Sequence, residues 1–150
     1  MKYVIASGYF NPIHVGHVEY LELAKELGDK LYVIVNSDHQ AELKRGIPSF
    51  MPEQDRQSIV QGLKSVDGTM VSIDQDLSVC ESIKELWMEL KRDEGAEEFV
   101  FAKGGDRFSN EIPEAIVCKE LDIEIVDGLG DKIRNSSDNS FWNLIRESIS

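Results

Sequence analysis

The sequence predicts a single α/β domain with a parallel sheet and helices on both of its faces. Short apolar runs typical of buried strands alternate along the chain with longer stretches that repeat apolar residues at helical spacing. The chain has 150 residues, of which 41% are hydrophobic, and can therefore bury one substantial core. Strands that alternate with helices form right-handed βαβ units, and such units build a parallel sheet.

The first half of the chain begins with two buried strands and a helix between them. Residues 2–7 form an apolar run that ends at Gly8, and residues 31–35 form a second run. Between them, apolar residues recur at helical spacing, and Gly28 ends that helix. Its apolar positions are Val15, Val18, Leu21, Ala24 and Leu27.

The next segment, residues 37–51, is polar and contains Gly46 and Pro48, so we expect a loop with at most one helical turn. Pro52 opens the following helix, because proline fits the first helical turn and the acidic residues behind it suit the positive end of the helix dipole. The spacing places Arg56 on the inward face of this helix. The apolar residues expected on that face are Ile59, Val60 and Leu63.

The second half of the chain continues the alternation. Its expected elements are a strand at 69–73, a helix at 79–91, a strand at 99–102, a helix at 111–121, a strand at 123–126 and a closing helix marked by Phe141, Leu144, Ile145 and Ile149. Gly128 and Gly130 are expected in a loop. The five strands give a Rossmann-like parallel sheet, and ligands of such sheets bind beyond the carboxyl ends of the strands.

The charge balance excludes several classes of partner. The chain carries 28 acidic and 16 basic residues, a net charge of −12, which argues against nucleic-acid binding.

The two cysteines, Cys80 and Cys118, form no disulfide framework, and we expect both in helices away from the carboxyl edge of the sheet. His14 and His17 have no clear third metal ligand near this edge of the sheet, so no metal site is predicted. No long apolar run or signal peptide is present, so we expect a cytoplasmic protein that contacts no membrane.

The segment after the first strand carries two histidines at the start of a helix. The helix begins near His14, where free N–H groups and the positive end of the dipole favour a phosphate. His14 and His17 share one face of the first turn, and Gly16 between them allows a ligand to approach closely. Two imidazoles there can donate to phosphate oxygens. Alternatively, His14 caps the helix and His17 is a satisfied histidine of the core.

Positive charge follows the second strand. Lys44 and Arg45 are the only adjacent cations in the first 90 residues, and in an acidic chain this pair suits an anion clamp. A solvated surface pair is the alternative. An inward Arg56 must meet an anion, which is either a structural carboxylate or a ligand phosphate. Asp38 is expected to cap a helical turn.

Two later loops also reach this edge. Lys103, Gly104, Gly105 and Asp106 follow the fourth strand, where the glycines allow a tight turn. Ser136 and Ser137 precede the last helix and offer a second candidate phosphate cradle. The chain contains no G-x-G-x-x-G dinucleotide fingerprint and no G-x-x-x-x-G-K-[ST] phosphate loop, which excludes those two modes of nucleotide binding.

Residues 8–17, Gly-Tyr-Phe-Asn-Pro-Ile-His-Val-Gly-His, resemble the HxGH signature of the cytidylyltransferase-like nucleotidyltransferase superfamily. Further similar segments follow in the same order along the chain. They are residues 35–38, Lys44-Arg45, residues 52–56, Val66-Asp67, residues 103–106 and Ser136-Ser137. The pattern is closest to the adenylyltransferase domain of heptose-phosphate enzymes, followed by glycerol-3-phosphate cytidylyltransferase.

This resemblance implies transfer of AMP or CMP from ATP or CTP to a phosphorylated small molecule, a sugar or polyol phosphate, with release of pyrophosphate. Mg²⁺ is the implied cofactor, held through the triphosphate rather than by protein ligands, and a homodimer is the implied assembly. Because the attacking phosphate is already ionised, catalysis consists of positioning and charge neutralisation.

The resemblance also implies roles for single residues. His14 and His17 contact the triphosphate and stabilise the transition state at the α-phosphate. Lys44 holds substrate and triphosphate oxygens, and Arg56 binds the acceptor phosphate or organises the site. The residues implied in nucleotide binding are Gly8, Tyr9, Phe10, Asn11, Gly16, Gly104, Gly105, Asp106, Arg134, Ser136 and Ser137. Those implied in acceptor binding are Asp38, Lys44, Arg45 and Arg56.

The sequence departs from the family pattern at two places. Asn11 stands where sugar- and polyol-phosphate members often have aspartate, and residues 11–14 also resemble nicotinamide-mononucleotide adenylyltransferases. Residues 133–137 read Ile-Arg-Asn-Ser-Ser rather than Ile-Ser-Thr-Thr, so Arg134 is a candidate for part of the triphosphate role. A mononucleotide adenylyltransferase and a non-catalytic nucleotide-sensing module are therefore the alternative functions.

Overall fold

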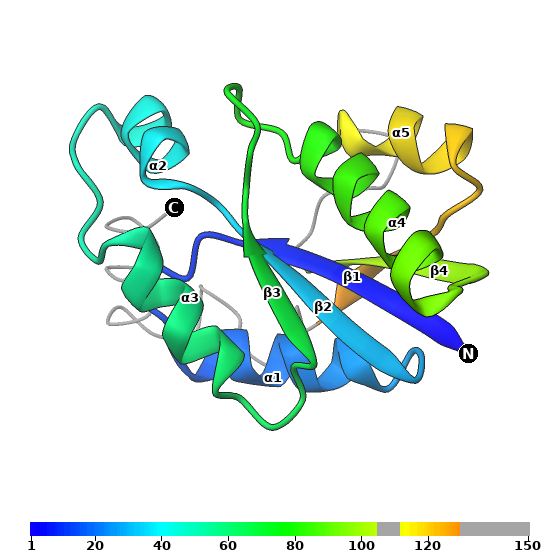
Figure 1. The fold of residues 1–150 in the computed structure, drawn as a ribbon. Helices are drawn as coiled ribbons and strands as arrows, with labels where there is room; N and C mark the ends of the chain where they lie inside the picture. The colour runs from blue at the N-terminus through cyan, green and yellow to red at the C-terminus, as the bar shows by residue number, and fades with distance from the viewer. Residues whose placement is uncertain (105–111, 130–150) are drawn as a thin grey trace.

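The fold is a five-stranded, all-parallel sheet with helices on both faces, as predicted (Figure 1). The computed structural model describes residues 1–104 and 112–129. The strand order is β3-β2-β1-β4-β5, so the chain reverses its direction of travel across the sheet between β1 and β4. The strands are β1 (Lys2–Gly8), β2 (Lys30–Val35), β3 (Gly68–Val71), β4 (Glu98–Gly104) and β5 (Glu124–Leu129).

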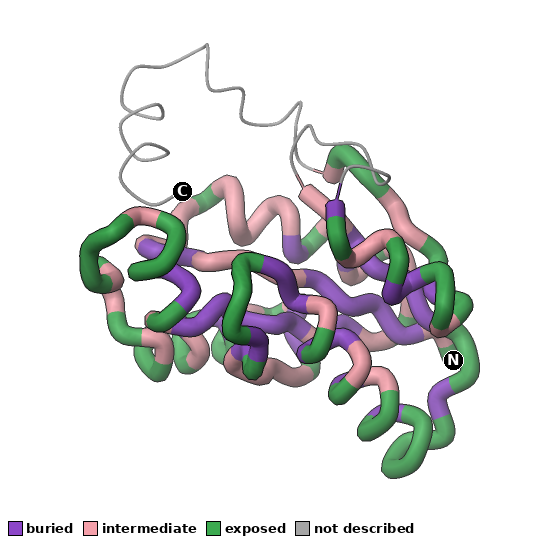
Figure 2. The backbone as a smooth tube through the Cα atoms, turned by 90° about the horizontal axis from the view of Figure 1, so that it is seen from above, coloured by how far each residue is buried: buried purple, intermediate pink, exposed green. Residues whose placement is uncertain are grey.

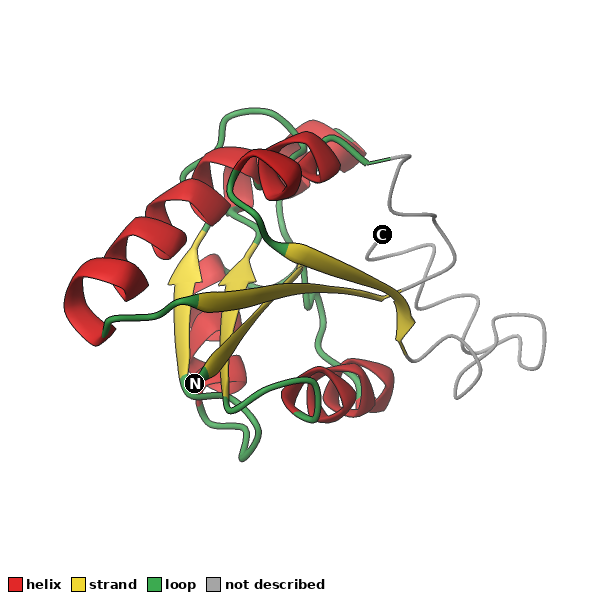
Figure 3. Ribbon diagram, turned by 90° about the vertical axis from the view of Figure 1, so that its right-hand side faces the viewer, coloured by secondary structure: helices red, strands yellow, loops and turns green. Residues whose placement is uncertain are grey.

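The helices form a layer on each side of the sheet (Figures 1 and 3). The helices of the described residues are α1 (Val15–Lys25), α2 (Asp38–Arg45), α3 (Glu53–Gln61), α4 (Cys80–Glu94) and α5 (Glu114–Glu120). Helices α1 and α3 cover one face, and α4 and α5 cover the other. Helix α2 lies just beyond the carboxyl end of β2, at the edge where ligands of such sheets bind.

The core consists of two apolar layers that the sheet separates. Along β1, Val4 and Ala6 pack toward α1 and α3, whereas Tyr3 and Ile5 pack toward α4 and α5. All four side chains are buried, which explains why the central strands are continuous apolar runs (Figure 2). No described helix combines the length and apolar character needed to cross a bilayer.

The prediction of a loop for residues 37–51 was wrong over its first half, where the structure has helix α2. Ser37 and Gln40 form a capping box at its start, and Gly46 ends it in the left-handed conformation with φ of 77°. The sequence carries these signals, and Gly46 ends a helix within the segment instead of breaking the whole of it.

Smaller differences concern the edges of the fold. Strand β3 ends at Val71 rather than at residue 73, and β5 includes Gly128, which was expected in a loop. Ile59 was expected to face inward but is 40% exposed. Cys80 was expected away from the carboxyl edge of the sheet, but it lies near that edge. It is the first residue of α4 and directly follows Val79, which lines a crevice at this edge. The predicted closing helix at Phe141 to Ile149 lies outside the described residues.

Candidate active site

The turn between β1 and α1 is built around one glycine and one buried aromatic ring. Phe10 is 1% exposed and has a φ of 52°, which folds its side chain back over the end of β1. A Cβ added at Gly8 would lie 2.8 Å from the Phe10 ring, so only glycine fits there. The turn leads to His14, where α1 begins as predicted, and His14 is the N-cap, in agreement with the alternative interpretation of this residue.

The two histidines of this turn contact each other. Their rings stack with centroids 3.8 Å apart, and the backbone N–H of His14 donates to Nδ1 of His17 at 3.1 Å. The ring of Phe10 packs edge-on against His17 with centroids 5.0 Å apart. Both histidines therefore take part in capping the N-terminus of α1. Their predicted contact with phosphate stays a proposal.

Burial holds both imidazoles in the neutral form near pH 7. Burial lowers the pKa of His14 to about 4. Burial, followed by the nearby His14, lowers the pKa of His17 to about 3. Because Nδ1 of His17 accepts a hydrogen bond, the neutral ring carries its proton on Nε2. The pair can donate hydrogen bonds to an anion without adding positive charge.

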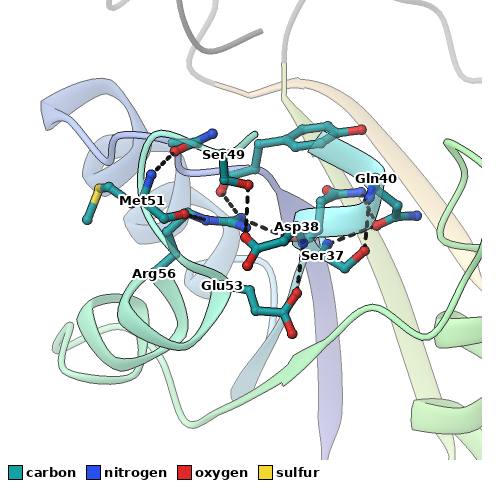
Figure 4. Close-up of polar contacts among 10 residues, drawn as sticks. Ser37, Asp38, Gln40, Ser49, Met51, Glu53 and Arg56 are labelled. Atoms are coloured by element: carbon teal, nitrogen blue, oxygen red, sulfur yellow. Dashed lines mark hydrogen bonds and ion pairs between the residues drawn. The ribbon is translucent and has the colours of Figure 1, made fainter. Parts of the chain in front are cut away.

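Arg56 of α3 is the centre of a buried network beneath α2 (Figure 4). Its side chain is fully buried, and it forms a 2.7 Å ion pair with Oδ1 of Asp38. Its other donors reach main-chain carbonyls of Tyr9 and Asn36, each at 2.7 Å, and of Met51 at 2.8 Å. Arg56 thereby connects the ends of β1 and β2 to the loop before α3.

This network fits one of the two roles implied for Arg56, which is to organise the site, while binding of the acceptor phosphate by Arg56 stays a prediction. The spacing correctly placed Arg56 inward, and its anion is the structural carboxylate of Asp38. Partial burial by itself raises the pKa of Asp38. The hydrogen bonds that its carboxylate accepts from Ser49 and Arg56 lower the pKa by a larger amount, so the net shift is downward. Asp38 also does not cap α2, because Ser37 has that position. Arg56 and Asp38 organise the site and neither lines its cavity.

A crevice lies where the strand order reverses, between the ends of β1 and β4. It has a volume of about 390 Å³. Its described lining residues are Ser7, Gly8, Tyr9, Tyr20, Asn36, Lys44, Leu77, Val79, Phe101, Lys103, Gly104, Ile112 and Glu114. The reversal point of a doubly wound sheet is the usual ligand site of such folds. The lining combines apolar side chains with the cations Lys44 and Lys103.

Several lining residues escaped prediction from the sequence. The hydroxyl of Tyr20 donates to the Ala102 carbonyl at 2.6 Å, and its ring lies so close to Gly104 that an added Cβ there would be 3.1 Å away. Glu114 accepts a hydrogen bond from the Val79 backbone N–H at 2.9 Å and so ties α5 to the start of α4. These residues reach the crevice from helices, and no local motif marks them.

The structure brings part of the predicted site together. Gly8, Tyr9, Lys44 and Gly104 line the crevice. The predicted residues Phe10, Asn11, His14, Gly16 and His17 lie in the adjoining β1–α1 turn, where Asn11 accepts a hydrogen bond from the Met51 backbone N–H at 2.8 Å. Arg45 does not line the crevice, unlike Lys44. Gly105, Asp106, Arg134, Ser136 and Ser137 lie outside the described residues.

No set of three His, Cys, Asp or Glu side chains among residues 1–104 and 112–129 is arranged to hold a metal ion. The prediction that Mg²⁺ binds through substrate phosphates requires no such set. The described residues are therefore compatible with a metal that arrives with its nucleotide.

Comparison of this chain with known proteins identifies a family that it matches. The model of the Cytidylyltransferase-like family matches residues 5–148. An FAD synthase of Pyrococcus abyssi is 37% identical over 83 residues, which are 55% of this chain and 55% of that protein. An FAD synthase of Ferroglobus placidus is 43% identical over 77 residues, which are 51% of this chain and 49% of that protein. The aligned region thus spans about half the length of these relatives.

A solved structure covers more of the chain. The lipopolysaccharide core biosynthesis protein from Thermoplasma volcanium superposes with a TM-score of 0.62 and 26% sequence identity, and the match covers 85% of this chain and 95% of that protein. The likeness thus extends over most of this chain.

Proposed function

The chain belongs to the cytidylyltransferase-like family, and we propose that it transfers a nucleotidyl group from a nucleoside triphosphate to a phosphorylated small molecule. An oxygen of the acceptor phosphate forms a bond to the α-phosphorus, the bond to the β-phosphate breaks, and pyrophosphate leaves. The observation that carries this proposal is the crevice between β1 and β4, which is lined by Lys44 and Lys103 and adjoins the β1–α1 turn with its imidazole pair.

The residues of this crevice suit a reaction between two anions. Lys44 and Lys103 supply positive charge, and the first turn of α1 supplies free backbone N–H groups. His14 and His17 are neutral donors whose hydrogen bonds strengthen as charge grows on the α-phosphate. Mg²⁺ bound to the triphosphate supplies further charge neutralisation. No general base is needed, because the attacking phosphate is already ionised.

We propose ATP as the donor and FMN as the first acceptor to be tested. The support is that relatives at 37–43% identity are FAD synthases, although the alignments span only about half their length. A sugar or polyol phosphate is the second acceptor class, supported by the likeness to a lipopolysaccharide core biosynthesis protein. Nicotinamide mononucleotide is the third, because of the Asn-Pro-Ile-His sequence at residues 11–14.

Pyrophosphate release tests the activity. The protein is incubated with Mg²⁺, each of ATP, CTP, GTP and UTP, and a panel of FMN, glycerol 3-phosphate, heptose phosphates and nicotinamide mononucleotide. We expect release with one donor and one acceptor class, and a large loss in Lys44→Met but not in Lys64→Met, which removes an exposed lysine outside the crevice. No release with any pair contradicts the proposal.

A thermal-shift titration with the four triphosphates separates the alternatives. A ligand that binds only the native state raises the melting temperature, and the rise increases with the logarithm of its concentration relative to its dissociation constant. Stabilisation by a triphosphate without turnover against any acceptor indicates a nucleotide-sensing module instead. Size measurement in solution tests the homodimer that the family resemblance implies.

A further inference from the structure

Lys44 is held against an aromatic ring at the mouth of the crevice. Its ammonium nitrogen lies 4.6 Å from the ring centroid of Tyr9, within the range of a cation–π contact. Both residues line the cavity. They come from different elements, since Tyr9 directly follows β1 and Lys44 lies in the last turn of α2. The contact therefore joins the last turn of α2 to the end of β1.

The orientation of α2 directs Lys44 toward this ring. Gln40 lies one turn before Lys44 on the same face of the helix, and it is fully buried. Its Nε2 donates to the carbonyls of Asp76 and Ser78 at 2.7 and 2.8 Å. Its Oε1 accepts from Asn36 Nδ2 and from the Ser37 backbone N–H, both at 3.0 Å. These bonds fix the rotation of α2 and hence the side on which Lys44 emerges.

The ring of Tyr9 is the fixed partner in the pair. The backbone carbonyl of Tyr9 accepts a 2.7 Å hydrogen bond from the buried Arg56, which anchors the residue just beyond β1. Tyr9 is half-buried, whereas Lys44 is an exposed residue with a long, flexible stem. An unrestrained lysine loses rotamer entropy when it is immobilised. A ring that restricts the ammonium in advance reduces this loss when an anion binds.

We propose that Tyr9 is a positioning residue that holds the Lys44 ammonium at the crevice through its ring face before a polyphosphate binds. The π-face, and not the phenolic hydroxyl, performs this role. The contact itself is a property of the ligand-free protein. Its consequence for nucleotide binding rests on the proposed function, so the two are tested by separate measurements.

The first measurement is the rate at which Lys44 reacts with an amine-acetylating reagent, followed by peptide mass spectrometry on the full chain. Lys64, which is exposed and outside the crevice, serves as the internal reference. We expect Tyr9→Leu to raise the Lys44 rate relative to Lys64 by about two- to fivefold, since exposed cation–π contacts are of this strength. Tyr9→Phe, which keeps the ring, is expected to retain the protection.

An unchanged ratio of Lys44 to Lys64 labelling in Tyr9→Leu overturns the proposal, as does equal loss of protection in Tyr9→Phe. Circular dichroism and a melting curve verify that each variant is folded. Tyr9→Met is the second variant, because it keeps an apolar side chain of similar length without a π-face, and it must raise Lys44 labelling as Tyr9→Leu does.

The second measurement is a double-mutant cycle on Mg²⁺–ATP affinity. Tyr9→Leu is expected to weaken ATP binding by about two- to fivefold when Lys44 is present and to have no further effect in the Lys44→Met background. Additive effects indicate that Tyr9 acts independently of Lys44 and overturn the positioning role. If the unmodified protein binds no nucleotide, the proposed function fails, while the labelling result still decides whether Tyr9 holds Lys44.

Discussion

Two neighbouring regions at the carboxyl edge hold polar side chains in place by opposite means. The β1–α1 turn, residues 8–17, relies on neutral groups, since its two histidines stack on each other and are kept uncharged by burial. The α2–α3 corner, residues 36–56, relies on charge, with the fully buried Arg56 bound to Asp38 and to three backbone carbonyls. Both regions border the same crevice.

The difference shows what each region is suited to do. A buried cation with its donors engaged is costly to remove and holds loops together, but it has little left to offer a ligand. A neutral imidazole pair contributes less than the buried Arg56 to holding separate elements together. Because Nδ1 of His17 accepts a hydrogen bond, its Nε2–H remains a donor. We therefore expect mutations in the α2–α3 corner to lower stability and mutations in the β1–α1 turn to lower turnover.

The largest expected effect is on stability in the α2–α3 corner. Arg56→Met removes the buried guanidinium and leaves the carboxylate of Asp38 and three carbonyls without this donor. We expect the free energy of unfolding to fall by about 3–5 kcal/mol, measured by urea denaturation.

The matched control is Lys25→Met, which breaks a partly exposed 2.7 Å ion pair with Asp67. Partly exposed pairs contribute at most about 1 kcal/mol, so this variant is expected to remain near the parent stability. Equal losses in the two variants contradict the distinction between the buried network and a surface pair.

The next effect is on turnover in the β1–α1 turn. His17→Ala removes the donor that we propose acts on the charge developing at the α-phosphate, so we expect a loss of about 10²–10³ in kcat with the productive donor and acceptor. The measurement is steady-state pyrophosphate release, with a denaturation curve for the same variant. Activity close to the parent value removes His17 from the mechanism. A fall in stability that accounts for the whole loss of activity assigns it to the helix cap alone.

A smaller effect on stability is expected at Gln40, the second buried polar centre of the corner. Gln40→Leu keeps the approximate volume but leaves the carbonyls of Asp76 and Ser78 without their donor. We expect a loss of about 1–3 kcal/mol in the free energy of unfolding. Gln54→Leu, at an exposed position of α3, is the control and is expected to change stability by less than about 0.5 kcal/mol.

The sequence was sufficient to predict the sheet because its central strands are buried on both faces. Residues 3–6 and 31–35 are unbroken apolar runs, and such runs have few alternatives in an α/β chain. Helix α2 was missed although Ser37 and Gln40 form a legible capping box, because its mean composition is polar and only two of its residues, Gln40 and Ala41, are buried. Patterns of apolar residues cannot reveal a helix that is fixed by buried polar groups.

The sequence indicated residues that follow the carboxyl ends of predicted strands, and it did not indicate residues that reach the crevice from within helices. Helical spacing indicated that Arg56 faces inward, but its partner Asp38 lies 18 residues earlier in the unpredicted helix. Tyr20 and Glu114 reach the crevice only because the strand order places β1 beside β4. Contacts of this kind depend on topology, which the order of elements along the chain does not specify completely.

The smallest expected effect is the dependence of stability on pH caused by the β1–α1 turn. The pKa values of His14 and His17 are lowered from 6.5 to about 4 and about 3 in the folded protein, so below pH 6.5 the unfolded chain binds protons that the native state does not. Stability is therefore fully present above pH 6.5 and falls as the pH decreases toward 4.

Urea denaturation at several pH values between 7 and 5 isolates this contribution, because carboxylates titrate mainly below that window. With allowance for the partial solvent exposure of the turn, we expect a decrease of about 1 kcal/mol across the window. His14→Gln and His17→Gln should each flatten the curve, whereas His39→Gln, which removes an exposed imidazole of α2, should keep its slope. A slope that survives removal of both turn histidines shows that their neutrality does not distinguish this turn from the charged corner.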